Sequence, residues 1–201
     1  MVVALLVSAG LVGCAGGPRG GGVDAGGPVP VAAGADSAGA DAAARAAVRS
    51  CPGPGRPASG EPVLPDLTLP CLGNGPAVTL RRLAGTPTVI NLWASWCGPC
   101  RAELPAFDQL QDAAGSRLRV LGVVNEDPPG RALSFAADAG VHLPSVVDET
   151  GRLRRGLARA NMPTTVFVDA AGRVVEVYTG VPFTAATLRQ RVLDRLGVDV
   201  G

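Results

Sequence analysis

The sequence predicts an α/β domain in which a central mixed β-sheet is flanked by helices. Three observations predict this fold class. Hydrophobic residues make up 47% of the 201 residues, enough to build a core, and all seven aromatic residues lie at or beyond Trp93. Short runs of β-branched and apolar residues alternate with longer segments whose apolar residues recur at helical spacing. A short turn, Asp169–Gly172, joins the last two such runs and predicts an antiparallel hairpin.

The first clear element is a buried strand. Thr88–Trp93 is a continuous run of mostly β-branched and apolar residues. A helix begins near Cys97, because apolar residues recur at helical spacing from Leu104 onwards. Pro99 suits the first turn of this helix, where its missing N–H leaves no hydrogen bond unmade. Pro105 lies further along and predicts a kink.

The same alternation of short apolar runs and amphipathic segments continues to the C-terminus. We interpret each apolar run as a strand and each amphipathic segment as a helix. In chain order these are a strand over Arg119–Asn125, a helix from about Gly130 to Ala139, a strand over Ser145–Asp148, a short helix over Gly151–Ala158, strands over Val166–Val168 and Val174–Tyr178, and a final helix over Thr184–Leu196 that Gly197 caps.

The N-terminal segment, residues 1–13, is apolar apart from Ser8. As a helix it would reach roughly 20 Å, which is short of the ~30 Å hydrocarbon core of a bilayer. Its length suits a signal peptide, although no Lys or Arg precedes the apolar run. The sequence Leu-Val-Gly before Cys14 resembles the lipobox of bacterial lipoproteins, which implies a lipid on Cys14. An ordinary signal peptide with an incidental cysteine is the alternative.

Residues 14–50 have the composition of a tether. From Ala15 to Ser50, 24 of 36 residues are Ala, Gly or Pro, so this stretch has little bulky apolar surface to bury. A flexible coil of about 36 residues spans on the order of 30–35 Å, enough to hold a domain clear of lipid headgroups. We therefore expect a lipid-anchored flexible tether over residues 14–50, with no more than a transient helix over Ala38–Val48, followed by one folded domain over 51–201.

Five cysteines are an odd number, which needs an explanation in an exported protein. If Cys14 carries a lipid, four remain, and two of their three possible pairings would use up one thiol of the closely spaced Cys97 and Cys100. We predict the pairing that leaves this close pair intact, which is a structural disulfide between Cys51 and Cys71 and a separate Cys97–Cys100 couple. Two free thiols or a four-thiolate zinc site are the alternatives, but Cys51 and Cys71 lack the spacing of a zinc knuckle.

The position of Cys97 predicts its chemistry. It lies where a strand gives way to a helix, and the unpaired N–H groups and positive dipole of a helix N-terminus stabilise a thiolate. Cys97 is therefore the expected nucleophile, and the more buried Cys100 is the expected resolving thiol. Trp96 is expected to pack beside the pair and limit access to it.

These residues carry a resemblance to a known family. The run Trp96–Cys100, Trp-Cys-Gly-Pro-Cys, resembles the thioredoxin superfamily, and the wider Asn-Leu-Trp-Ala-Ser-Trp-Cys-Gly-Pro-Cys-Arg-Ala-Glu-Leu-Pro is similar to the TlpA/ResA-type membrane-anchored thiol-disulfide oxidoreductases. The resemblance covers about Val63 to Leu196. It implies a thioredoxin-like fold with an extra helical insert over Asn125–Pro144.

The resemblance also implies roles for residues outside the cysteine pair. In that family the proline matching Pro163 is cis and lies against the cysteines, and the backbone of the residue matching Met162 pairs with an extended substrate chain. Thioredoxins have a buried acid at the position that Asn91 occupies here. The side-chain amide of Asn91 cannot titrate. The resemblance places an acid at Glu103 instead, which would share the side of the helix that holds Cys100. The alternative for Glu103 is an exposed first-turn carboxylate.

The function that follows is an extracytoplasmic thiol-disulfide oxidoreductase that needs no cofactor or metal and exchanges disulfides with protein cysteines. The resemblance implies reduction of apocytochrome c thiols, with a membrane electron donor or acceptor as partner, and we expect a monomer. A formal net charge of +1 argues against nucleic acid. An oxidative disulfide-forming catalyst, a Sco-like copper chaperone with His142 as its ligand, and a peroxidase are the alternatives. The Arg152, Arg154, Arg155 and Arg159 group is interpreted as a solvated face.

Overall fold

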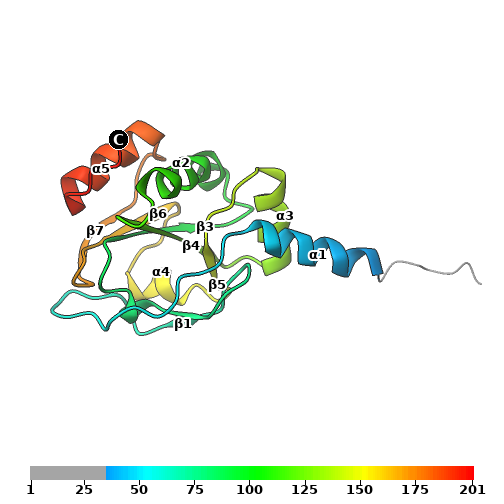
Figure 1. The fold of residues 1–201 in the computed structure, drawn as a ribbon, viewed down its shortest axis with the longest axis horizontal. Coiled ribbons are helices and arrows are strands. Elements are labelled where there is room, and N and C mark those ends of the chain that lie inside the picture. The colour runs from blue at the N-terminus through cyan, green and yellow to red at the C-terminus, as the bar shows by residue number, and fades with distance from the viewer. Residues whose placement is uncertain (1–34) are drawn as a thin grey trace, which may run out of the picture. The chain divides into compact units, whose positions relative to one another are not determined.

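The computed structural model describes residues 35–201, in which a two-stranded sheet, β1-β2, accompanies a central five-stranded sheet covered by helices (Figure 1). The central sheet has the order β5-β4-β3-β6-β7. β3 pairs in parallel with β4, and β4 with β5, whereas β6 runs antiparallel to β3 and β7 antiparallel to β6. The strands are β3 (Thr88–Trp93), β4 (Arg119–Asn125), β5 (Ser145–Asp148), β6 (Thr164–Val168) and β7 (Val174–Tyr178).

Helices and short extended segments bury the two faces of this sheet. Alternate side chains of a strand point to opposite faces, so Val89 and Trp93 of β3 join one core cluster and Ile90 joins the other. The first cluster contains side chains of α2 (Gly98–Ala114), α3 (Pro129–Asp138) and α5 (Ala185–Leu196). The second contains side chains from α4 (Arg152–Gly156), β1 (Thr68–Leu69), β2 (Val78–Thr79) and the 3-10 turn Leu80–Arg82.

The observed elements confirm the predicted fold class. Four strands have the expected bounds, and β6 begins two residues earlier than expected, at Thr164. α2 continues unbroken through Pro105. α3 lies between β4 and β5, so the expected helical insert is present. The two-residue strands β1 and β2 were not predicted, because segments this short carry no periodic pattern.

The N-terminal part of the domain departs from the prediction of a flexible tether up to residue 50. α1 spans Ala35–Ala47 and packs against α3 (Figure 1). Val48 is 4% exposed and belongs to the first core cluster. Arg49 forms ion pairs with Asp108 and Asp112 of α2. The prediction was wrong for this stretch because Val48 and Arg49 find partners far away in the sequence.

The remaining N-terminal predictions concern residues outside those that the structure describes. The signal peptide at 1–13, the lipid on Cys14 and the first part of the tether all lie there. Within residues 35–201, no helix is both long enough and apolar enough to cross a bilayer.

Candidate active site

Cys97 lies at the point where the sheet passes into α2. β3 ends at Trp93, a short loop follows, and Cys97 is the N-cap residue of the helix. Its Sγ accepts a hydrogen bond from the backbone N–H of Cys100 at 3.3 Å. Pro99 occupies the first turn, as expected. The sulfur of Cys97 is thus held against the N–H groups that a helix N-terminus leaves unpaired.

The structure shows Cys97 and Cys100 joined by a disulfide. Cys97 is 6% exposed and Cys100 is fully buried, so only the first cysteine offers any surface to solvent. This asymmetry suits a pair in which one sulfur meets an external partner and the other reacts only within the protein.

Glu103 follows Cys100 by three residues in α2 and is buried. One carboxylate oxygen accepts a hydrogen bond from the side-chain amide of Asn91 at 2.7 Å, and the other accepts one from the backbone N–H of Phe183 at 3.0 Å. Burial raises the pKa of Glu103, and these two hydrogen bonds partly oppose that rise. The alternative of an exposed first-turn carboxylate is wrong, because Glu103 is only 1% exposed.

A groove of about 440 Å³ opens beside Cys97. Trp96, which is 57% exposed, and Ala160–Met162, the segment before Pro163, both line it. The Met162–Pro163 peptide bond is cis. The structure therefore brings together Cys97, Trp96 and Met162 around one groove, whose complete lining is Trp96, Cys97, Gly98, Pro99, Arg154, Ala160, Asn161 and Met162.

Cys51 and Cys71 form the second disulfide. Cys51 belongs to the core cluster on the face of the sheet opposite to that of Cys97 and Cys100. Cys71 forms an isolated bridge with Val146 of β5. This disulfide therefore links the segment that enters the domain to the edge of the sheet, away from the groove.

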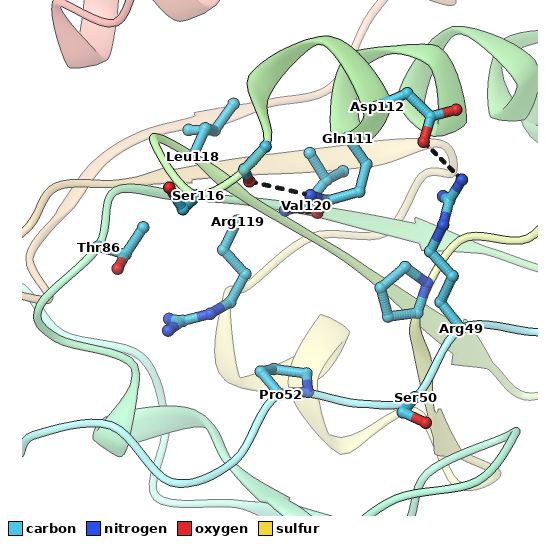
Figure 2. A pocket seen from close by; sticks show the side chains of 12 residues that line it. Arg49, Ser50, Pro52, Thr86, Gln111, Asp112, Ser116, Leu118, Arg119 and Val120 are labelled. Carbon is cyan, nitrogen blue, oxygen red and sulfur yellow. Dashed lines mark hydrogen bonds and ion pairs between the residues drawn. The ribbon is translucent and has the colours of Figure 1, made fainter.

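A cavity of about 560 Å³, larger than this groove, lies elsewhere, at the C-terminal end of α2 (Figure 2). Its lining includes Gln111 and Asp112 of the helix but no cysteine or histidine. The Arg119 guanidinium is held by the carbonyl oxygen of Leu83 at 2.8 Å and the hydroxyl of Thr88 at 3.2 Å. We assign the chemistry to the smaller groove, because that one contains the reactive sulfur.

His142, the candidate copper ligand, does not line the groove at Cys97. Its backbone N–H donates to Asp108, and its carbonyl accepts from the N–H of Arg49. Among residues 35–201, no three His, Cys, Asp or Glu side chains are grouped so that they could hold a metal ion.

Sequence reasoning missed two residues beside the groove, Arg154 and Glu126. Arg154 is not part of a solvated face: its side chain is 22% exposed, lines the groove and donates to the carboxylate of Glu126. Arg152 and Arg155 are more exposed, as expected. One short helix turn carries no periodicity that separates Arg154 from its neighbours, so only the three-dimensional contacts identify it.

Comparisons with known proteins agree with this site. A family model described as Redoxin matches residues 58–190. A thiol:disulfide interchange protein DsbE of Pseudomonas fluorescens biotype C is 32% identical over 120 residues, which cover 58% of this chain and 65% of that protein. Relatives named thiol-disulfide oxidoreductase ResA also match. The chain spans less than two thirds of the length of the first curated relatives.

Solved structures show the same fold. The crystal structure described as a thiol:disulfide interchange protein DsbE from Chlorobium tepidum has a TM-score of 0.59 at 30% identity, covering 70% of this chain and 99% of that one. The pneumococcal exposed lipoprotein thioredoxin Etrx1 of Streptococcus pneumoniae strain TIGR4 has a TM-score of 0.56 at 27% identity, covering 64% and 98%. The expected thioredoxin-like fold is confirmed.

Proposed function

This chain belongs to the Redoxin family, and we propose that it is an extracytoplasmic thiol-disulfide oxidoreductase that exchanges disulfides with protein cysteines. The observation that carries the proposal is the Cys97–Cys100 disulfide at the N-terminus of α2, in which Cys97 is 6% exposed beside a groove and Cys100 is fully buried. The names of the curated relatives support the same class of reaction.

In the reducing direction, the Cys97 thiolate attacks one sulfur of a substrate disulfide. A bond forms between Cys97 and that sulfur, and the other substrate sulfur leaves as a thiolate and takes up a proton. Cys100 then loses its proton and attacks the Cys97 sulfur, which releases the second substrate thiol and leaves the Cys97–Cys100 disulfide. The helix N-terminus stabilises the Cys97 thiolate at the start of this sequence.

We propose that Glu103 acts in the second step, where it accepts the proton that Cys100 loses. It follows Cys100 by one helical turn, and burial raises its pKa, so it can bind a proton at a pH where an exposed carboxylate would be ionised. Asn91 holds the Glu103 carboxylate by a hydrogen bond and does not itself titrate. Glu103 thus takes the place of the acid that thioredoxins have at the position of Asn91.

The groove suits an extended polypeptide. Trp96 offers an exposed aromatic surface on one side, and the backbone at Met162, before cis Pro163, offers hydrogen-bonding groups on the other. A substrate chain lying between them would present its sulfur to Cys97. We propose protein substrates on this ground. The resemblance to the TlpA/ResA type leads us to include apocytochrome c among them.

We further propose that the domain works outside the cytoplasm, tethered by a lipid on Cys14 after removal of residues 1–13. The Leu-Val-Gly-Cys sequence supports this, and so does the likeness to a structure described as an exposed lipoprotein thioredoxin. The Cys51–Cys71 disulfide suits an oxidising compartment. A monomer anchored in this way would exchange electrons with a membrane-bound donor or acceptor.

Trapping a reaction intermediate tests the proposal. The Cys100→Ser variant should accumulate a mixed disulfide between Cys97 and a protein substrate such as insulin, because the resolving thiol is missing. The Cys97→Ser variant should accumulate none. Equal trapping by the two variants, or none by either, would refute the assignment of the nucleophile.

The direction of the reaction in the cell is tested by the equilibrium between the Cys97–Cys100 couple and glutathione. A potential near the −270 mV of thioredoxin would identify a reductant. A potential near the −120 mV typical of DsbA would instead identify an oxidant that forms disulfides.

A further inference from the structure

The groove beside Cys97 is lined by two segments from distant parts of the chain, which we call its two sides. Trp96 precedes α2, whereas Ala160–Met162 lies between α4 and β6. An extended substrate can bind both sides at once only if their separation is fixed. Glu126 is hydrogen-bonded directly to Trp96 and, through Arg154, to Ala160.

Glu126 follows the last residue of β4, and its backbone and its side chain accept hydrogen bonds from different residues. Its carbonyl oxygen accepts a hydrogen bond from the indole N–H of Trp96 at 3.1 Å. Its carboxylate accepts from the guanidinium of Arg154. Arg154 in turn donates to the carbonyl oxygen of Ala160 at 2.7 Å. A continuous chain of contacts therefore runs from Trp96 through Glu126 and Arg154 to Ala160.

A second path reinforces the first. The side-chain amide of Asn125 donates to the Glu126 carboxylate and to the sulfur of Met162, both at 3.3 Å. Met162 is thus held from the same short segment that holds Trp96. Both sides of the groove are bonded, directly or through Arg154, to Asn125 and Glu126.

The backbone around Glu126 shows how closely these groups are packed. Glu126 has a φ of +52°, an uncommon conformation for a residue other than glycine. Gly151, just before α4, faces its side chain, and a Cβ added at Gly151 would lie 2.8 Å from the Glu126 carboxyl carbon. The absence of a side chain at Gly151 lets the start of α4 approach Glu126, so that Arg154 reaches the carboxylate.

We propose that Glu126 and Arg154 are a positioning pair that sets the width of the substrate groove beside Cys97. The inference rests on the proposed function, because it concerns how a polypeptide reaches that sulfur. Neither Glu126 nor Arg154 takes part in the exchange reaction of the two cysteines. Its loss should therefore weaken the binding of polypeptides and leave the reaction with small disulfides intact.

Arg154→Met tests this by removing the charge and both hydrogen bonds while keeping an unbranched apolar side chain. We expect the KM for insulin to rise about tenfold, with kcat and the rate with hydroxyethyl disulfide changing less than about twofold. Arg154→Lys keeps the cation but not the fork of donors, so its KM should lie between those of the wild type and Arg154→Met. Arg191→Met, which removes the similarly exposed ion pair with Glu176, is the matched control and should leave both rates unchanged.

A double-mutant cycle tests whether the two residues act together. If they form one unit, Glu126→Ala combined with Arg154→Met should raise the KM for insulin no more than the larger single change does. Independent roles would make the two increases multiply, and that result would overturn the proposal. An equal fall in the rates with insulin and with hydroxyethyl disulfide would also overturn it, because it would point to the chemistry or to misfolding.

A binding measurement separates this inference from the proposed function. With both Cys97 and Cys100 replaced by Ser, no exchange is possible, and the affinity for a reduced, alkylated insulin B chain can be followed by the fluorescence of the exposed Trp96. Arg154→Met in this background should weaken binding about tenfold. Unchanged affinity refutes the positioning pair, whatever the exchange assays show, whereas failure of the trapping experiment alone refutes the assignment of Cys97.

Discussion

The side-chain amide of Asn91 donates a hydrogen bond of 2.7 Å to the carboxylate of Glu103, across the interface between β3 and α2. Val89, Asn91 and Trp93 share one face of β3, because alternate residues of a strand point the same way. That face carries the helices, so Asn91 meets Glu103 where a thioredoxin would have its buried acid. In the mechanism proposed above, the proton-binding group therefore lies on the helix that holds Cys100 instead of on the strand.

This burial makes stability depend on pH. Because the folded-state pKa of Glu103 is raised above its ordinary value of 4.5, the folded protein binds more protons than the unfolded chain between that value and the raised pKa. The contribution of Glu103 to the free energy of unfolding is therefore largest below pH 4.5 and declines as the pH rises through this window. Glu103→Gln removes the contribution. In urea unfolding at several pH values, the advantage of the wild type over the variant should shrink as the pH rises.

The exposed Glu149 provides a control for this measurement. Glu149→Gln, the same substitution at a surface position, should change the free energy of unfolding by less than about 0.5 kcal/mol. Parallel curves for the wild type and Glu103→Gln would contradict the ionisation that we assign to Glu103. The proton-transfer role would then have no support from titration.

The second disulfide should contribute stability but not activity. Cys51 and Cys71 are 20 residues apart, and closing a loop of this length stabilises a protein by roughly 3 kcal/mol in the chain-entropy model. Replacing both with Ala should lower the Tm by about 6–12 °C. Exchange with insulin at 25 °C should be retained, because this disulfide and the Cys97 couple lie on opposite faces of the sheet. An unchanged Tm in calorimetry, or a loss of exchange at 25 °C, would show that this assignment is wrong.

Gly122 in β4 should tolerate no side chain. A Cβ there would lie 2.2 Å from the hydroxyl oxygen of Ser145 and 2.7 Å from the indole nitrogen of Trp93, both buried. Gly122→Ala should therefore destabilise the protein by about 1–3 kcal/mol in urea unfolding. Adding Ser145→Ala should recover part of this loss, because it removes the nearest atom.

A glycine with free space around it provides the comparison. At Gly130 in α3, an added Cβ would meet nothing within 4 Å. Gly130→Ala should be neutral or stabilising by up to about 1 kcal/mol, because alanine favours the helix. If Gly122→Ala were equally harmless, the close packing around β4 would be wrong.

Local sequence patterns were enough to predict the sheet and the cysteine pair. Thr88–Trp93 is mostly apolar and is buried on both faces, as a strand between two layers must be, and the helix start at Cys97 follows from the residues next to it. Arg154 could not be identified in this way, because its partners Glu126 and Ala160 come from separate loops. Contacts of this kind depend on the folded arrangement and leave no periodic signal in the sequence.

The start of the ordered domain was misjudged for the same reason, and this leads to a last prediction. The Ala/Gly-rich composition before residue 51 indicates a coil, but Val48 is buried and the neighbouring Arg49 is paired with two aspartates of α2. Val48→Ala should therefore cost about 1.5–3 kcal/mol in the free energy of unfolding, from two lost methyl groups and the cavity they leave. Val181→Ala, at a largely exposed position, should change it by less than about 0.5 kcal/mol. Equal effects in urea unfolding would mean that the segment before Cys51 is a tether after all, whereas a clear difference places the domain boundary on the N-terminal side of Val48.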